Sequence, residues 1–221
     1  MMGKVRLSVL KYADVHVHTN YTDGRNTIRE YCQRALQNNI EAIAFTEHVR
    51  RNLDYNFDNF LLDIERARRE FPQLVILGGC EAKVLNTEGE LDAPENVLSQ
   101  CEVVIGVFHS FEHKGKRSYL AALKAMVRNP IVDIWGHPTI YLKERNMKLE
   151  KEELSEIINA CVENGVLIER NLKHNLPDAS FMELALKKGA KFVIGSDAHS
   201  VGELPTMHRL EEEWEWINKM Y

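Results

Sequence analysis

The stretch Tyr12-Ala13-Asp14-Val15-His16-Val17-His18 decides how this sequence can fold. It is a short β-rich run that ends in two histidines, and residues i and i+2 of a strand point to the same face. Both imidazoles can therefore serve one shared metal ion. Similar runs recur along the chain, and nearly every one ends in a histidine or a charged side chain. One such pair would indicate little, whereas their repetition at strand ends indicates a common site.

Seven β-rich runs alternate with helical segments along the chain. We expect strands at residues 12–17, 41–45, 74–81, 102–108, 132–135, 166–169 and 191–194. Helices are expected at residues 27–39, 57–71, 94–99, 117–128, 150–164, 178–188 and 204–220. Thr27-x-x-Glu30 matches a capping box, and Asn129-Pro130 and Gly165 are stop signals. This alternation favours parallel strands joined by right-handed crossovers.

Two folds satisfy that alternation, an open doubly wound sheet and a closed barrel. The sequence contains no G-x-G-x-x-G or Walker-type loop, so a nucleotide-binding open sheet loses its usual signal. In a β/α barrel, the chemistry gathers at the C-terminal ends of the strands. Because the ionisable side chains of this sequence fall at those ends, we expect a barrel with one central site.

Nine residues of metal-ligand type lie at or just after the expected strand ends. They are His16, His18, Asp23, His48, Glu81, His109, His137, Asp197 and His199. Each has an ordinary alternative, such as a turn residue for Asp23 or a salt-bridged carboxylate for Glu81. The sharpest local signal is Gly195-Ser-Asp-Ala-His199, which repeats the spacing of the first pair. The joint placement in phase with the strands favours a multinuclear metal site.

Size, charge and cysteine usage set broad limits. The chain has 221 residues, enough for one large α/β domain or two small ones. Its net charge of −5 gives no bulk attraction to nucleic acid or acidic membranes. No C-x-x-C pair occurs among Cys32, Cys80, Cys101 and Cys161, so we expect free, mostly buried thiols. No signal peptide or membrane-length apolar segment is visible. We therefore expect a soluble cytoplasmic protein without membrane contact.

The ordered set of motifs resembles the PHP family, named for polymerase and histidinol phosphatase. The motifs are His16-Val-His18-Thr-x-x-x-Asp23-Gly, Thr-Glu-His48, Gly-x-Glu81, His109-Ser, Gly-His137-Pro and Ser-Asp197-Ala-His199. They span about residues 14–200, ahead of the helix expected at 204–220. The resemblance implies a stand-alone single domain over residues 1–221. The implied fold is a distorted (β/α)7 TIM-like barrel, an α/β architecture, and the implied activity is phosphoester hydrolysis with two to three divalent metal ions.

Motif positions in the family imply which residues share an ion. The first ion would take His16, His18, Glu81 and Asp197, the second would share Glu81 with His109 and His137, and the third would take Asp23, His48 and His199. Six imidazoles and three carboxylates suit Zn, Mn or Fe and disfavour Ca. Glu47 stands where relatives often carry Asp, and we expect it to support the ligands without binding an ion.

The resemblance and the charges together predict how a phosphate ester would be bound. Metal ions would contact the phosphate oxygens and lower the pKa of a bound water, which gives a hydroxide nucleophile. Basic side chains would complete the phosphate pocket. Arg170, at the end of the sixth strand, is the first candidate, and Arg145 and Lys143 are weaker ones with a solvated loop charge as the alternative.

For the remaining histidines we predict positions at the barrel mouth or on the surface. His113 could line the mouth of the barrel, whereas His174 and His208 match no motif and are expected on the surface. The apolar C-terminal residues Trp214, Trp216 and Ile217 could cap the barrel or meet another subunit, and capping is favoured. The oligomeric state is left open.

Three functions remain in view. The leading one is a histidinol-phosphatase-like phosphomonoesterase acting on a small phosphorylated metabolite, without commitment to histidinol phosphate. The second is a phosphodiesterase or exonuclease acting on nucleotides or short nucleic acid, which needs basic and stacking side chains along a groove. Residues 114–117, Arg50-Arg51, Tyr21, Tyr55 and Phe111 could supply these, although the net acidity argues against it. The third, a non-catalytic metal-binding regulatory barrel, is disfavoured because all nine ligand positions are filled.

Overall fold

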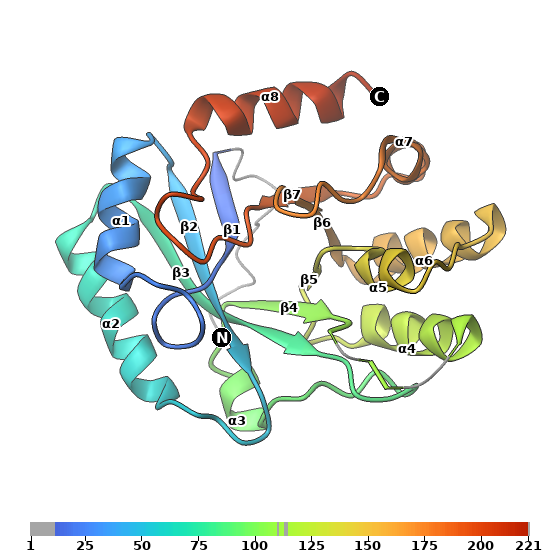
Figure 1. Cartoon of the computed structure of the whole chain (residues 1–221), viewed down its shortest axis with the longest axis horizontal. Helices are drawn as coiled ribbons and strands as arrows, with labels where there is room; N and C mark the ends of the chain where they lie inside the picture. The colour runs from blue at the N-terminus through green and yellow to red at the C-terminus, as the bar shows by residue number, and fades with distance from the viewer. Residues whose placement is uncertain (1–11, 110, 113–114, 221) are drawn as a thin grey trace.

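Seven parallel strands form one sheet at the centre of the molecule, in the order β1-β2-β3-β4-β5-β6-β7 (Figure 1). The structure is a computed structural model that describes residues 12–109, 111–112 and 115–220. The strands are β1 (Ala13–Val17), β2 (Ala42–Val49), β3 (Val75–Lys83), β4 (Val103–Val107), β5 (Ile134–Trp135), β6 (Leu167–Asn171) and β7 (Phe192–Gly195). The expected alternation of seven strands with helices is confirmed.

Helices surround the sheet on its outer side (Figure 1). They are α1 (Ile28–Gln37), α2 (Phe57–Glu70), α3 (Glu95–Leu98), α4 (Lys116–Arg128), α5 (Ile140–Glu144), α6 (Lys151–Asn164), α7 (Ala179–Lys187) and α8 (Met207–Asn218). The capping box expected at the start of α1 is present, since the Thr27 side chain accepts from the Glu30 amide and the Glu30 side chain accepts from the Thr27 amide. Helix α5 is not among the expected helices.

Strands β1 and β7 meet and nearly close the sheet into a barrel. A parallel bridge joins Val17 to Ala198, and the His18 amide donates to the Ala198 carbonyl at 2.9 Å. Below this bridge the buried carboxylate of Asp14 accepts from the Ser196 amide at 2.9 Å. Burial raises the pKa of Asp14 to about 6. The predicted distorted TIM-like barrel is thereby confirmed, with a seam between its first and last strands.

Side chains of the strands divide into two apolar layers, one inside the barrel and one under the helices. The inner cluster consists of Ala13, Val15, Ala42, Ala44, Leu77, Val103, Ile105, Val107, Ile134 and Val193. The outer cluster includes Phe45, Ile64, Leu123 and Ile157. Because successive residues of a strand face opposite sides, the inner set fixes which later residues of each strand face the barrel mouth.

The first strand breaks this alternation once. Its pairing with β2 shifts register between Asp14 and Val17. Val15 belongs to the inner cluster, Val17 to the outer one, and His16 contacts groups inside the barrel. A bulge of this kind re-aims side chains, so His16 and His18 both face the mouth above the apolar interior.

The C-terminal helix α8 packs on its own barrel, as the sequence favoured. Leu210 and Ile217 are buried in the outer cluster, and Glu213 is buried beside them.

The cysteines are unpaired, and three of them are buried. Within the described part of the chain, no helix combines the length and the apolar character that crossing a membrane requires.

Candidate metal centre

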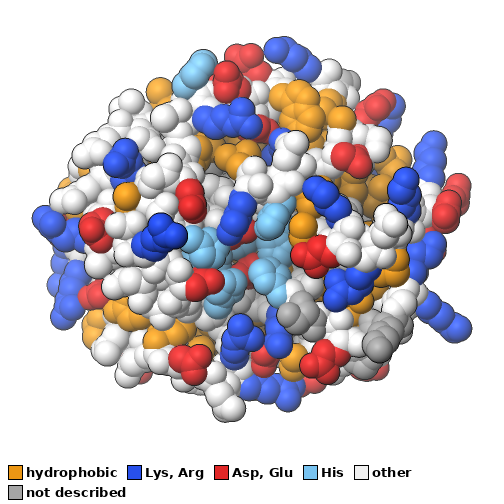
Figure 2. All heavy atoms as spheres, in the orientation of Figure 1, with side chains coloured by type: hydrophobic (Ala, Val, Ile, Leu, Met, Phe, Trp, Pro, Cys, Tyr) orange, Lys and Arg blue, Asp and Glu red, His pale blue; other side chains and the backbone are white. Residues whose placement is uncertain are grey.

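All nine predicted ligand residues lie together at the barrel mouth. Their nitrogen and oxygen atoms form three groups whose members lie within 4.8 Å of one another: His18 with Asp23, His48 and His199; His16 with His18 and Asp197; and Glu81 with His109 and His137. Figure 2 shows the imidazoles gathered in a hollow at the middle of one face, with Lys and Arg side chains around it. The grouping differs from the predicted one in two ways: His18 belongs to two groups, and Glu81 belongs to one group with His109 and His137 and is not shared with the group of His16, His18 and Asp197.

Glu81 lies at the centre of the cluster and is buried. Its Oε1 lies 2.8 Å from His137 Nε2 and 3.2 Å from His109 Nε2, while its Oε2 lies 2.6 Å from His48 Nδ1. Burial alone would raise the pKa of Glu81, but hydrogen bonds from His109 and His137 outweigh it and hold the pKa well below its usual range. The carboxylate is therefore an anion that reaches two sides of the cluster at once, as a bridging ligand must.

The spacing of two pairs of buried ligand atoms fits a bound ion better than hydrogen bonding. His16 Nε2 lies 3.5 Å from Glu81 Oε1, and His18 Nε2 lies 3.5 Å from Asp197 Oδ1. Both nitrogens are buried and have no hydrogen-bond partner within the described residues. Ligand atoms that each lie about 2.1 Å from a shared tetrahedral ion are roughly 3.4 Å apart. The donor set and its spacing thus fit divalent cations of the Zn, Mn or Fe type.

The third group is more open to solvent. Asp23 Oδ2 lies 3.3 Å from His48 Nε2 and 3.4 Å from His199 Nε2, and the Asp23 side chain is 55% exposed. Burial would raise the pKa of Asp23, but the neighbouring His48 and His199 charges lower it. An ion here would be the most accessible one to a substrate.

Glu47 supports the loop that carries Asp23 and lies on the opposite face of β2 from His48. It accepts from the Thr19 amide at 2.8 Å and from the Thr22 hydroxyl. Burial raises the pKa of Glu47 to about 7 despite these hydrogen bonds. Its contacts are those of a supporting residue.

Lys173 and His174 contact the cluster although the sequence did not single them out. Lys173 Nζ lies 3.4 Å from Asp197 Oδ1 and 3.2 Å from His199 Nδ1, and His174 Nε2 lies 3.5 Å from Asp197 Oδ2. Burial would raise the pKa of Asp197, but the neighbouring imidazoles of His174 and His18 hold it below its usual range. His174, expected on the surface, has a side chain that is 34% exposed, and it also contacts the cluster because the loop after β6 folds its ring back over the mouth. His208 is 80% exposed, as expected.

Glu169 and Arg170 are neighbours on β6 with opposite surroundings. Glu169 Oε1 lies 2.6 Å from His16 Nδ1 inside the barrel, and its Oε2 accepts from the His137 amide. Arg170 faces outward, where Nε donates to Glu213 at 2.9 Å and the guanidinium stacks on Trp216 at 4.6 Å. These contacts join α8 to the barrel and disfavour the phosphate-binding role predicted for Arg170.

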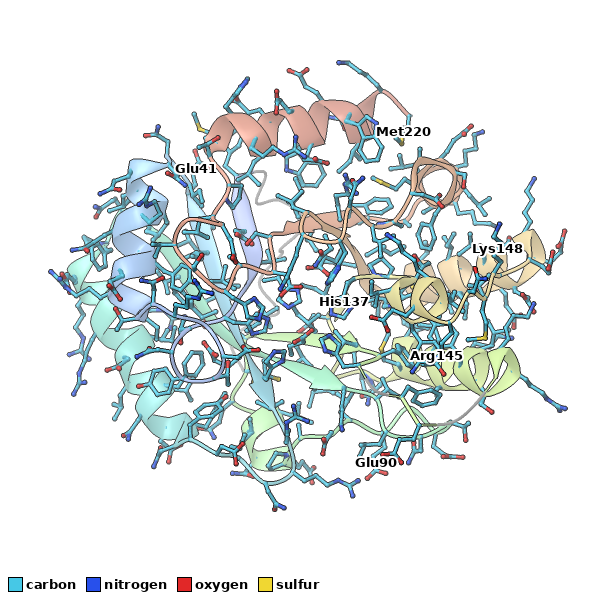
Figure 3. All side chains as sticks on the ribbon, in the orientation of Figure 1. Glu41, Glu90, His137, Arg145, Lys148 and Met220 are labelled. Atoms are coloured by element: carbon cyan, nitrogen blue, oxygen red, sulfur yellow. The ribbon has the colours of Figure 1, made fainter. Side chains whose placement is uncertain are left out.

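The two weaker phosphate candidates lie on and just after α5. Arg145 stacks on the Tyr141 ring at 3.8 Å and reaches Glu144 at 3.5 Å. Figure 3 places His137 at the middle of this face and Arg145 farther out. Lys143 is exposed, and within the described residues neither basic side chain contacts the nine. Their phosphate-binding role stays a prediction, and His113 lies outside the described residues.

Comparisons with known proteins agree with this geometry. A family model described as "PHP domain" matches residues 14–173. A "Probable phosphatase" from Acetivibrio thermocellus is 28% identical over 222 residues, which cover 90% of this chain and 86% of that protein. The "DNA polymerase/3'-5' exonuclease PolX" of Bacillus subtilis is 27% identical over 202 residues, covering 88% of this chain but 35% of that protein.

Solved structures share the fold at low sequence identity. Histidinol phosphate phosphatase from Lactococcus lactis, solved with zinc, L-histidinol and phosphate, aligns with a TM-score of 0.69 at 19% identity, covering 95% of this chain and 94% of that chain. A putative histidinol phosphatase from Listeria monocytogenes aligns with a TM-score of 0.72 at 15% identity, covering 87% and 97% of the two chains.

Proposed function

Since this chain belongs to the PHP domain family, we propose that it hydrolyses a phosphate monoester of a small metabolite, using two to three divalent ions held by the nine clustered residues. The observation that carries the proposal is the meeting of three ligand groups around the buried, anionic Glu81. Bound Zn, Mn or Fe ions would supply positive charge to the phosphate oxygens and activate a water as nucleophile. The ester P–O bond breaks, the water oxygen joins the phosphorus, and the alcohol leaves with a proton.

The chain's own residues orient the ligands for this task. Glu169 holds His16 through Nδ1, which leaves Nε2 directed toward Glu81 and Asp197. Such outer carboxylates fix the tautomer and the orientation of a ligating imidazole. Glu47 orients the loop that carries Asp23, because it accepts hydrogen bonds from the Thr19 amide and the Thr22 hydroxyl.

Lys173 is the cation that we assign to the phosphate in place of Arg170. Its ammonium already lies at the mouth between Asp197 and His199, and its side chain is 44% exposed. A flexible lysine in this position can move a short way to a phosphate oxygen and balance part of the dianion charge. Lys143 and Arg145 remain alternative contributors farther from the cluster.

The phosphatase and polymerase relatives support two related reactions. The probable phosphatases match over most of their length, which favours a monoesterase of comparable size. The similarity to a named 3'-5' exonuclease favours a phosphodiesterase as the second candidate. The unpaired cysteines support a reducing compartment such as the cytoplasm.

Hydrolysis of a matched pair of esters tests the proposal. Protein stripped with a chelator and then loaded with Zn, Mn or Fe is assayed on an aryl phosphate monoester and on the corresponding diester. Faster turnover of the monoester supports the proposal, and faster turnover of the diester shifts the function to nucleotides. Turnover of neither ester with any of the three metals refutes both.

A further inference from the structure

A cavity of about 220 Å³ adjoins the open side of the metal centre, between the loops that follow β1 and β2. Asp23 and His48 form its inner end, so it begins where the third ligand group is exposed. Tyr21, Arg50, Asp54 and Tyr55 are among the residues that line the rest. A phosphate held at the cluster would therefore place its alcohol in or beside this cavity.

One wall of the cavity is a fixed aromatic surface. The Tyr21 hydroxyl donates to Asp63 at 2.8 Å, and its ring lies 5.5 Å from Phe60 and 5.7 Å from Tyr55 between centroids. Helix α2 thus anchors Tyr21 from behind. A wall held in this way limits the size of the group that the cavity admits.

The opposite charges in the cavity have no partners of their own. Within the described residues, neither Arg50 nor Asp54 makes an ion pair or a side-chain hydrogen bond. The adjacent Arg51 differs, because its guanidinium binds Glu90 at 2.5 Å and its amide donates to Asp92 at 3.1 Å. Arg50 and Asp54 are therefore available to a ligand, whereas Arg51 already has its partners.

We propose that this cavity selects, as the alcohol of the substrate, a small zwitterion whose carboxylate meets Arg50 and whose ammonium meets Asp54. The inference rests on the proposed phosphomonoesterase function and names its substrate class. The volume is below the roughly 300–1,000 Å³ of typical drug-sized ligand pockets, so it suits an alcohol of a few carbon atoms. Both charges are exposed, and exposed charges contribute more to discrimination between ligands than to affinity.

Four small phosphate monoesters that differ in which charged groups their alcohol carries test the selection. O-phosphoserine carries both groups, 3-phosphooxypropionate the carboxylate, O-phosphoethanolamine the ammonium, and n-propyl phosphate neither. We expect kcat/KM for phosphoserine to exceed that for each single-charge ester about tenfold, because a hydrogen bond to a charged group contributes about that factor. Equal values for the four esters would overturn the inference.

Three variants assign the preference to particular residues. Arg50→Met should remove the advantage conferred by the carboxylate, and Asp54→Asn the advantage conferred by the ammonium, each measured as a ratio to n-propyl phosphate. Arg51→Met is the matched control, and its ratios should equal those of the unaltered protein. Ratios that change equally in Arg50→Met and Arg51→Met would show general electrostatics and overturn the assignment.

A binding measurement separates this inference from the proposed function. Titration of metal-loaded protein with free serine and with n-propanol reports occupancy of the cavity without turnover, and serine should bind more tightly and lose that advantage in Arg50→Met. If no monoester is hydrolysed, the proposed function fails. If n-propyl phosphate is hydrolysed as fast as phosphoserine and serine does not bind, the function stands and the zwitterion selection fails.

Discussion

The inside of the barrel has two levels with opposite chemistry. The lower level is filled by small and branched apolar side chains such as Val15, Ala44 and Ile105. The upper level holds buried imidazoles and carboxylates around Glu81, several of whose polar atoms lack hydrogen-bond partners among the described residues. Burial of the apolar side chains in the lower level stabilises the barrel. Burial of polar groups without partners in the upper level costs free energy unless a bound ligand interacts with them. The difference teaches that groups for stability and groups for function lie close together in sequence, from one residue apart for Val15 and His16 to four for Leu77 and Glu81.

The largest expected effect tests the upper level. Glu81→Gln keeps the size of the side chain but removes the negative charge that lies among the histidines. Because metal-ion charge supplies several kcal/mol to such reactions, we expect kcat/KM for a phosphate monoester to fall about 1,000-fold or more. Steady-state kinetics and bound-metal analysis measure this, with circular dichroism as the folding control. Near-normal turnover with full metal content would remove Glu81 from the site.

The next effect tests the outward face of β6. Arg170→Met leaves the buried Glu213 with one basic partner fewer, and removing one partner of a buried ion pair costs about 3 kcal/mol of unfolding free energy. Urea denaturation measures the loss. The KM of the folded variant should stay near that of the unaltered protein. A raised KM with unchanged stability would instead restore the phosphate-binding role predicted from the sequence.

A smaller effect is expected for the lysine at the mouth. Lys173→Met should raise the KM for a monoester about tenfold, as expected for one charge-assisted hydrogen bond to a phosphate oxygen. The affinity for inorganic phosphate, measured by calorimetry on metal-loaded protein, should fall by a similar factor. Lys143→Met is the matched control, because Lys143 is an exposed lysine of α5 that has no contact with the cluster among the residues that the structure describes. A larger effect in the control would reverse the assignment.

The smallest effect tests the lower level. Ile105→Val removes one methylene group from the apolar interior and should lower the unfolding free energy by about 1 kcal/mol. Turnover at a temperature well below the unfolding transition should be unchanged. Since Ile105 pairs with Glu81 in the register of β3 and β4, a change in kcat would show that the two levels are coupled.

Much of the fold follows from periodicity, and the exceptions have physical causes. The strand expected at residues 41–45 continues to Val49, because Thr46 and Glu47 are polar yet buried and pair in register with β3. Hydrophobic pattern cannot reveal a strand that continues through buried polar residues. Helix α5 has five residues, Ile140–Glu144, which is too short to show a helical period.

The candidate site could be anticipated where residues sit on strands and not where they sit on a folded-back loop. All nine clustered residues were identifiable, because strand ends meet at one edge of a parallel barrel. Lys173 and His174 were missed, since their position depends on the bridge between Asn171 and Leu176 that turns the loop back. For Arg170 the sequence did contain a signal. Successive residues of a strand face opposite sides, so if Glu169 faces the inside of the barrel, Arg170 must face outward, away from the cluster.

The seam between β1 and β7 has a consequence for motion. The same two strands that close the barrel lead directly into His16, His18 and Asp197, one of the three ligand groups. An ion held by that group would link residues on both sides of the seam. Opening of the barrel between β1 and β7 and metal binding at the cluster would then be thermodynamically coupled. The His18 amide, bound to the Ala198 carbonyl across the seam, is then a local reporter whose deuterium uptake slows as the centre fills.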